Sequence, residues 1–128
     1  MKATFVGLVF GAGPCVDRYL YEVDTPIECD GVLRCTDCMG YGCPWCGGGG
    51  IYSGYRETDY LVVDVTSRPA GNWSRRVEKV AISAADEYGN PIGADPLHTY
   101  YDQQSAQADD LRRVGAEALR KAGYEVVG

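Results

Sequence analysis

The chain has little positive charge, a single histidine and no long apolar run. Its 128 residues contain 12 Lys and Arg against 18 Asp and Glu, so the formal net charge is −6 at pH 7. An acidic chain repels phosphate, because non-specific binding to nucleic acid depends on Lys and Arg that release counterions. No stretch approaches the ~20 apolar residues of a membrane span, and residues 1–10 are too short and too alternating for a signal peptide. We therefore expect a cytoplasmic protein without membrane contact.

Glycine, tyrosine and cysteine are the residues that the chain has in excess, at 17, 10 and 6 copies. Apolar residues make up 45% and charged residues 23%, an ordinary balance for a globular protein. A chain of this length can bury enough surface for one core, so we expect a single domain spanning residues 1–128. Lys, Asn and Ile are scarce beside Gly, Ala and Arg, a bias typical of GC-rich bacterial or phage genomes.

Alternating apolar residues predict four main strands, at residues 2–10, 18–23, 60–66 and 77–83. Turn residues follow the first and third of these, which predicts two antiparallel hairpins. In the third strand, Leu61, Val63 and Val65 share one face. A short final strand is expected at residues 124–127.

The last third of the chain predicts one amphipathic helix over residues 106–122. Ser105 is its predicted N-cap, and Gly123 is its predicted C′ residue. One stripe should face the sheet, because apolar residues recur at helical spacing at Leu111, Val114, Ala118, Leu119 and Ala122. The expected fold class is therefore α+β, with a small antiparallel sheet, one C-terminal helix and an insertion between strands.

The insertion contains four of the six cysteines, spaced C-x-x-C-x-x-x-x-C-x-x-C at Cys35, Cys38, Cys43 and Cys46. Each C-x-x-C pair can form a tight turn that points both thiolates at one cation, and the glycines that follow favour such turns. Two pairs supply the four thiolates that a closed structural Zn²⁺ site takes. A reducing compartment also favours metal over disulfides. We predict one structural zinc ion in a zinc knuckle at residues 35–50.

Other interpretations of these cysteines are a disulfide, an iron–sulfur cluster and a redox dithiol. The spacing differs from the ferredoxin run, and a dithiol at Cys43 and Cys46 would open a helix, which Gly47–Gly50 disfavours. Only four residues separate Cys38 from Cys43, so this linker has to fold back tightly if one chain holds the ion. In the alternative arrangement, two chains share the ion and form a zinc-bridged homodimer.

Two tandem copies of C-x-x-C-x-G-x-G make up this segment, one from Cys35 to Gly42 and one from Cys43 to Gly50. Each resembles the repeat of the DnaJ-type cysteine-rich zinc-binding domain, over sixteen of the 128 residues. That family has four such repeats, whereas this chain has two and lacks the His-Pro-Asp signature of a J-domain. The resemblance implies metal binding at the four cysteines and a role in protein contact. It does not imply co-chaperone activity.

Aromatic residues in and after the motif are the candidate binding residues: Tyr41, Trp45, Tyr52 and Tyr55. Aromatic side chains on a rigid loop make good anchors for a partner protein, although the same rings would also serve to cover a metal site. The leading hypothesis is a non-enzymatic protein-interaction or regulatory protein. Its partner is expected to be another protein.

Two further hypotheses belong to other classes. In a nucleic-acid-binding protein, Trp45 and the tyrosines would stack on bases, and phosphates would meet Arg56, Arg68, Arg75 and Arg76. In an enzyme, His98 would be the favoured catalytic residue, paired with Cys15 or Cys29. A lone histidine is usually structural, and cysteines outside a motif are usually small buried apolar residues, so no catalytic residue is assigned.

Overall fold

The computed structural model describes most of the chain outside the cysteine segment. The described residues are 1–13, 15–34, 42, 44, 51–71, 74–92, 96–101, 103–107 and 109–128, with the backbone alone at 29–34 and 51–56. They form seven strands and one helix: β1 (Lys2–Val9), β2 (Val16–Arg34), β3 (Ile51–Pro69), β4 (Ser74–Ala85), β5 (His98–Tyr100), β6 (Gln104–Gln107), α1 (Leu111–Lys121) and β7 (Glu125–Val127). No helix among them is long and apolar enough to cross a membrane.

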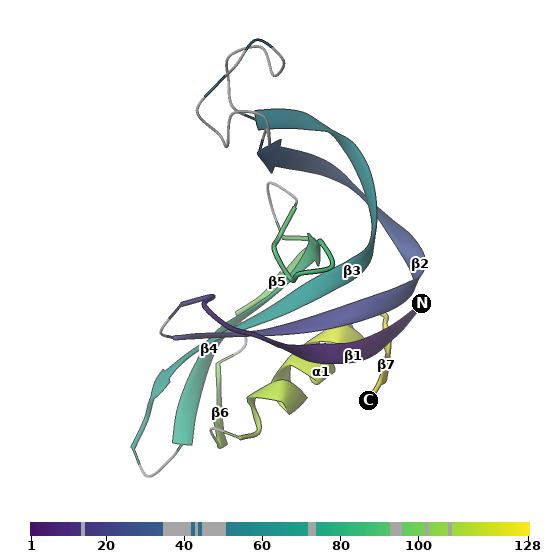
Figure 1. Cartoon of the computed structure of the whole chain (residues 1–128). Helices are drawn as coiled ribbons and strands as arrows, with labels where there is room; N and C mark the ends of the chain where they lie inside the picture. Colours follow the sequence, from purple (N-terminus) through teal and green to yellow (C-terminus); the bar gives the residue numbers. More distant parts are fainter. Residues whose placement is uncertain are drawn as a thin grey trace.

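The strands make one curled sheet with the order β5-β4-β3-β2-β1-β7, and β6 pairs with β4 beyond the end of β5 (Figure 1). The neighbours from β1 to β6 are antiparallel, as both predicted hairpins require. β7 is the exception, since it runs parallel to β1 and pairs with Lys2, Ala3 and Thr4. The two predicted hairpins, β1–β2 and β3–β4, are confirmed.

The predicted α+β fold class is wrong, because the described chain is mostly β with one short helix. β2 and β3 are 19 residues each, far longer than the predicted strands 18–23 and 60–66. The helix is 11 residues long and shorter than the predicted 106–122, because residues 104–107 pair with β4 as strand β6. The sheet is also not purely antiparallel. The zinc-knuckle part of the prediction lies outside the described residues.

β2 and β3 extend together beyond the rest of the sheet as a two-stranded ribbon. A register shift lies between Glu22 and Ile27, after which the pairing runs from Ile27 with Thr58 to Arg34 with Ile51. Pairs of β1 with β2 stop at Val23, and pairs of β3 with β4 stop at Tyr60. Within the described residues, the ribbon therefore has only its own two strands (Figure 1).

The main core lies between α1 and one face of the sheet. Leu111, Val114, Ala118 and Leu119 are buried against that face, as the helical spacing predicted. The predicted inward residues of β3 are fully buried there: Leu61, Val63 and Val65. Gly115 lets the helix approach closely, since a Cβ at this position would lie 3.1 Å from Cγ1 of Val63. The guanidinium of Arg112 covers the Phe5 ring at 3.6 Å from its centroid.

The helix begins at Leu111 and ends as predicted. Its N-cap is Asp110 and not Ser105, because Ser105 belongs to β6 and pairs with Arg76. At the other end, Gly123 has φ +100°, and its backbone N–H donates to the carbonyl of Arg120. A positive φ is favourable for glycine at a C′ position, so the predicted helix stop is confirmed.

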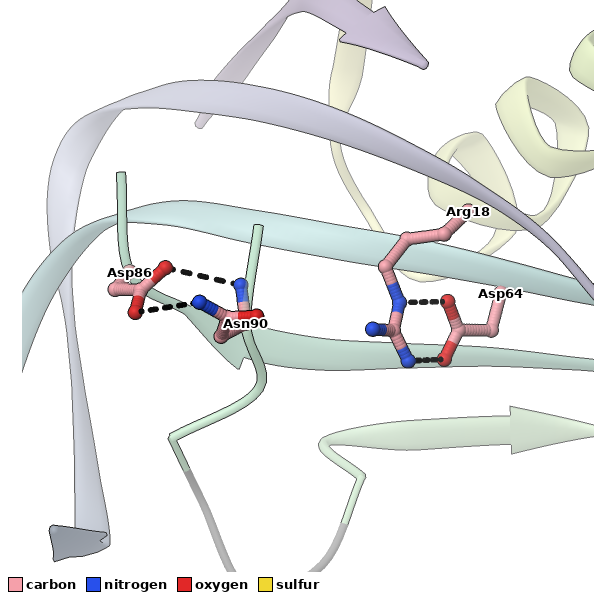
Figure 2. A network of polar contacts seen from close by, with 4 residues as sticks. All are labelled: Arg18, Asp64, Asp86 and Asn90. Carbon is pink, nitrogen blue, oxygen red and sulfur yellow. Dashed lines mark hydrogen bonds and ion pairs between the residues drawn. The ribbon is translucent and has the colours of Figure 1, made fainter. Parts of the chain in front are cut away.

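The opposite face of the sheet carries a smaller core and a partly buried ion pair. Its apolar cluster is Leu20, Val62 and Ala85. Beside it, Arg18 on β2 donates to Asp64 on β3 through Nε at 2.7 Å and Nη2 at 3.0 Å (Figure 2). Both side chains are 18% exposed, and the hydrogen bonds from Arg18 to Asp64 raise the pKa of Arg18. The pair satisfies polar groups on an otherwise apolar part of the sheet.

Candidate functional site

The four predicted zinc ligands, Cys35, Cys38, Cys43 and Cys46, lie outside the described residues. Two residues within the same segment are described, Gly42 and Pro44. Gly42 has φ +100°, a backbone conformation that residues with a side chain rarely adopt. A glycine is therefore required at the end of the first C-x-x-C-x-G-x-G repeat.

Both ends of the cysteine segment are held by one strand pair. Arg34 at the end of β2 and Ile51 at the start of β3 are direct partners in the antiparallel ladder. Direct partners lie about 4.5–5.5 Å apart between Cα atoms. The sixteen residues 35–50 therefore leave and re-enter the sheet at neighbouring points, at the end of the ribbon that lies farthest from α1 (Figure 1).

The predicted binding residues fall partly outside the structure. Tyr41 and Trp45 are outside the described residues, whereas Tyr52 and Tyr55 lie on β3 with only their backbone described. Tyr52 pairs with Leu33, and Tyr55 pairs with Asp30. Both tyrosines therefore belong to the two-stranded ribbon and not to the loop on which the sequence analysis expected them, and their role in binding stays a prediction.

Sequence reasoning missed an acidic cleft at the base of the ribbon. The cleft has a volume of about 400 Å³, and its lining contains four carboxylates and no Lys or Arg: Pro26, Glu57, Thr58, Asp59, Tyr60, Asp86 and Glu87. Residues 57–60 are on β3, and residues 86 and 87 follow β4. They come together because Tyr60 and Ala85 are partners in the β3–β4 ladder.

Local hydrogen bonds explain the shape of this cleft. The Thr58 hydroxyl donates to the carbonyl of Ala85, which ties β3 to the end of β4. Asp86 accepts from the backbone N–H groups of Tyr88 and Asn90, each at 2.9 Å, and from the Asn90 side chain at 3.3 Å (Figure 2). A hydrogen bond to Glu87 raises the pKa of Tyr88. The turn after β4 is thus built by its own carboxylates.

Like charges face each other across strands at two places along β3. Near the cleft, Glu57 stands directly opposite Glu28 of β2, and both are exposed. At the other end of β3, Arg68 stands opposite Arg76 of β4. Like charges that face each other across strands destabilise a sheet by about 0.2–1 kcal/mol, so both pairs need counter-charges or solvent. Arg68 has one, an ion pair with Glu78 at 3.0 Å.

The structure does not bring together a catalytic pair at His98. His98 is exposed on β5, and its ring is stacked with Tyr100 at a centroid distance of 6.4 Å. Cys15 precedes β2, and strands β3 and β4 lie between β2 and β5, which corresponds to about 14 Å of sheet. Cys15 is exposed and free, so its expected burial is wrong. Cys29 pairs with Arg56 on the ribbon, where only the backbone is described.

Comparisons with known proteins add no relative, since no family model, no curated protein and no solved structure matches the chain. The resemblance to the DnaJ-type domain therefore depends on the sixteen motif residues alone. The described residues, which leave out the four cysteines of the motif, contain no group of three or more His, Cys, Asp or Glu that could hold a metal ion. Any zinc site of the predicted kind has to be sought at residues 35–50.

Proposed function

We propose that this chain is a small, non-enzymatic zinc protein that binds another protein. One Zn²⁺ would be held by Cys35, Cys38, Cys43 and Cys46, and its four Zn–S bonds would cross-link the loop between β2 and β3. The donor set fits this ion, because it consists of four thiolates in two C-x-x-C pairs. We place the protein in the reducing cytoplasm of a bacterium or in phage-infected cells, where such thiols keep their metal.

The observation that carries the zinc proposal is the pairing of Arg34 with Ile51. This pair closes the loop before any metal binds, so part of the entropy cost of bringing the two C-x-x-C pairs together is already met by the sheet. The closed loop favours a zinc ion that takes all four ligands from one chain. In a zinc-bridged homodimer, each chain would supply only one C-x-x-C pair to a given ion.

The charge of the described surface supports a protein partner over nucleic acid. The cleft at the base of the ribbon has four carboxylates and no Lys or Arg, whereas Arg34 and Arg56 lie on the ribbon between the cleft and the cysteine segment. Arg68 and Arg76 are 17 or more residues from Ile51 in the ladder, which is about 55 Å along a strand. At the cleft, a phosphate backbone would therefore meet carboxylates and no counter-charge. A partner segment rich in Lys and Arg would be complementary to this cleft.

Native mass spectrometry tests the metal proposal. The full chain should carry one zinc, and Cys38→Ser with Cys43→Ser should carry none. Cys15→Ser is the matched control, because it removes an exposed thiol outside the motif and should keep the zinc. Two zincs per chain, iron–sulfur absorbance, or equal zinc in the double variant would refute the assignment.

A peptide array tests the partner proposal separately. Peptides that bind the zinc-loaded chain should be rich in Lys and Arg, and their binding should weaken in Glu57→Gln with Asp59→Asn. Asp109→Asn with Glu125→Gln removes two exposed carboxylates outside the cleft lining and should leave binding unchanged. Retention of a single-stranded oligonucleotide at moderate salt, with no peptide binding, would support the nucleic-acid hypothesis instead.

A further inference from the structure

The turn after β4 packs against β1, although two strands lie between β1 and β4 in the sheet. Gly89 is buried in this turn, whereas Glu87, Tyr88 and Asn90 around it are exposed. A Cβ built on Gly89 would lie 2.5 Å from Cγ2 and 3.2 Å from Cγ1 of Val9. In a flat sheet, β1 and β4 would be about 14 Å apart. The contact therefore depends on the curl of the sheet and on the length of the turn.

A small apolar cluster joins this contact to the acidic cleft. Leu20, Val62 and Ala85 form the cluster, and Val9 and Tyr60 pack against it. Tyr60 also lines the cleft. A change at the contact with Gly89 is therefore transmitted to the cleft wall through side chains that touch each other.

Hydrogen bonds make the turn a single unit. The carboxylate of Asp86 accepts from the backbone N–H groups of Tyr88 and Asn90, each at 2.9 Å (Figure 2). The backbone N–H of Asp86 donates to the carbonyl of Asn90 at 2.9 Å, and that of Gly89 donates to the carbonyl of Asp86 at 3.1 Å. A shift of Gly89 would therefore move Asp86 and Glu87 with it. Both of these carboxylates line the cleft.

We propose that Gly89 and Val9 are positioning residues of the acidic cleft, which set where Asp86 and Glu87 stand. This role rests on the proposed function for its ligand, a partner segment rich in Lys and Arg. Position 89 needs glycine for two reasons. Its φ is +84°, which residues with a side chain rarely adopt, and the γ-methyl groups of Val9 leave no room for a Cβ. Valine is branched at Cβ, so few side-chain rotations could relieve the clash.

Alanine substitutions separate the contact from the backbone strain. Gly71 has the same φ of +84°, but a Cβ there would meet nothing within 4 Å, so Gly71→Ala is the matched control. The probe is a hexapeptide of alternating Arg and Lys, added to the full chain. Gly89→Ala should weaken its binding about three- to tenfold, the equivalent of two exposed ion pairs. Gly71→Ala should bind the peptide like the wild type.

Val9→Ala should rescue the binding that Gly89→Ala loses. It removes both γ-methyl groups, and the Cβ of Val9 would lie 3.4 Å from the new Cβ at position 89. Gly89→Ala with Val9→Ala should therefore bind the peptide as Gly71→Ala does. If Gly89→Ala acted only by lowering stability, the loss of two packed methyl groups would increase its effect.

A nuclear Overhauser measurement on the wild-type chain needs no variant to fold and no peptide. Cross-peaks should join the Val9 methyl groups to the Hα protons of Gly89. A wild-type chain that binds no basic peptide would overturn the proposed partner and this role with it. If the wild type binds, the role alone is overturned by missing cross-peaks, by unchanged binding in Gly89→Ala, by an equal loss in Gly71→Ala, or by failure of Val9→Ala to rescue.

Discussion

Replacement of Leu119 tests whether the helix is part of the core. Leu119 is 0% exposed and packs, with Val114 and Leu111, against the face of the sheet that Val63 and Val65 form. Truncation of a buried leucine to alanine usually costs about 2–5 kcal/mol, because the lost transfer free energy is joined by the energy of the cavity. A domain of this size has about 5–15 kcal/mol of stability in total. Leu119→Ala should therefore remain folded.

The thermal shift follows from the chain length. At about 2.1 cal/mol/K of unfolding entropy per residue, a loss of 3 kcal/mol lowers the Tm of this chain by roughly 11 °C. Leu119→Asp adds the cost of a buried, unpaired carboxylate, several kcal/mol more, which brings the loss close to the total stability. We expect this variant to lack a cooperative transition in circular dichroism and calorimetry.

Arg120→Ala is the control, because it changes the next residue on the exposed side of the same helix. Its Tm should stay within a few degrees of the wild type, in line with the ±0.5 kcal/mol of most surface substitutions. An unchanged Tm in Leu119→Asp would refute the packing described here. The helix would then be free of the sheet in solution.

Three further predictions concern the loop, the helix contact and the tyrosines. Cys38→Ser with Cys43→Ser should abolish zinc binding yet keep the far-ultraviolet circular dichroism spectrum, because residues of the strands and of α1 supply an apolar core between them; complete unfolding would contradict this. Gly115→Leu should cost about 1–3 kcal/mol in urea unfolding, since even a Cβ lies 3.1 Å from Val63, and an unchanged midpoint would show that the helix moves away. Burial raises the pKa of Tyr19 to about 12, so its proton favours the folded state; stability from this residue is complete below the ordinary pKa of about 10 and is lost as the pH rises through 12. Absorbance at 295 nm should follow alkaline unfolding in that window, and Tyr19→Phe should reduce the loss.

The strands with a one-sided apolar pattern could be predicted from the sequence. Val63 and its alternate neighbours face the core, and the partner strand β4 follows after a turn with glycine, so the hairpin was recognisable. Gly123 also marked the end of the helix, because few other residues adopt its φ of +100°. These features are local, and each depends on a chemical property of one or two residues.

The ribbon and the short strands could not be predicted, because these segments become strands only by pairing with other strands. Residues 24–34 include Pro26, a glycine and three acidic side chains, a composition typical of a loop, and a two-stranded ribbon has no buried face to impose alternation. Gln104–Gln107 is polar and resembles a helix start through Ser105, but β4 offers it a free edge. The acidic cleft was missed for a similar reason, since Glu57 and Asp86 become neighbours only through the ladder.

The parallel pairing of β1 with β7 affects when the fold can be completed. Lys2 pairs with Glu125, so β1 waits for almost the whole described chain before this part of its edge is covered. Contacts between residues so far apart in sequence slow folding, because a long loop must close before they contribute. During synthesis β1, which has no charged residue after Lys2, is exposed on both edges until β2 and then β7 are made. The interval before β7 pairs is when this protein is most prone to aggregate, and slower growth at lower temperature should raise its soluble yield.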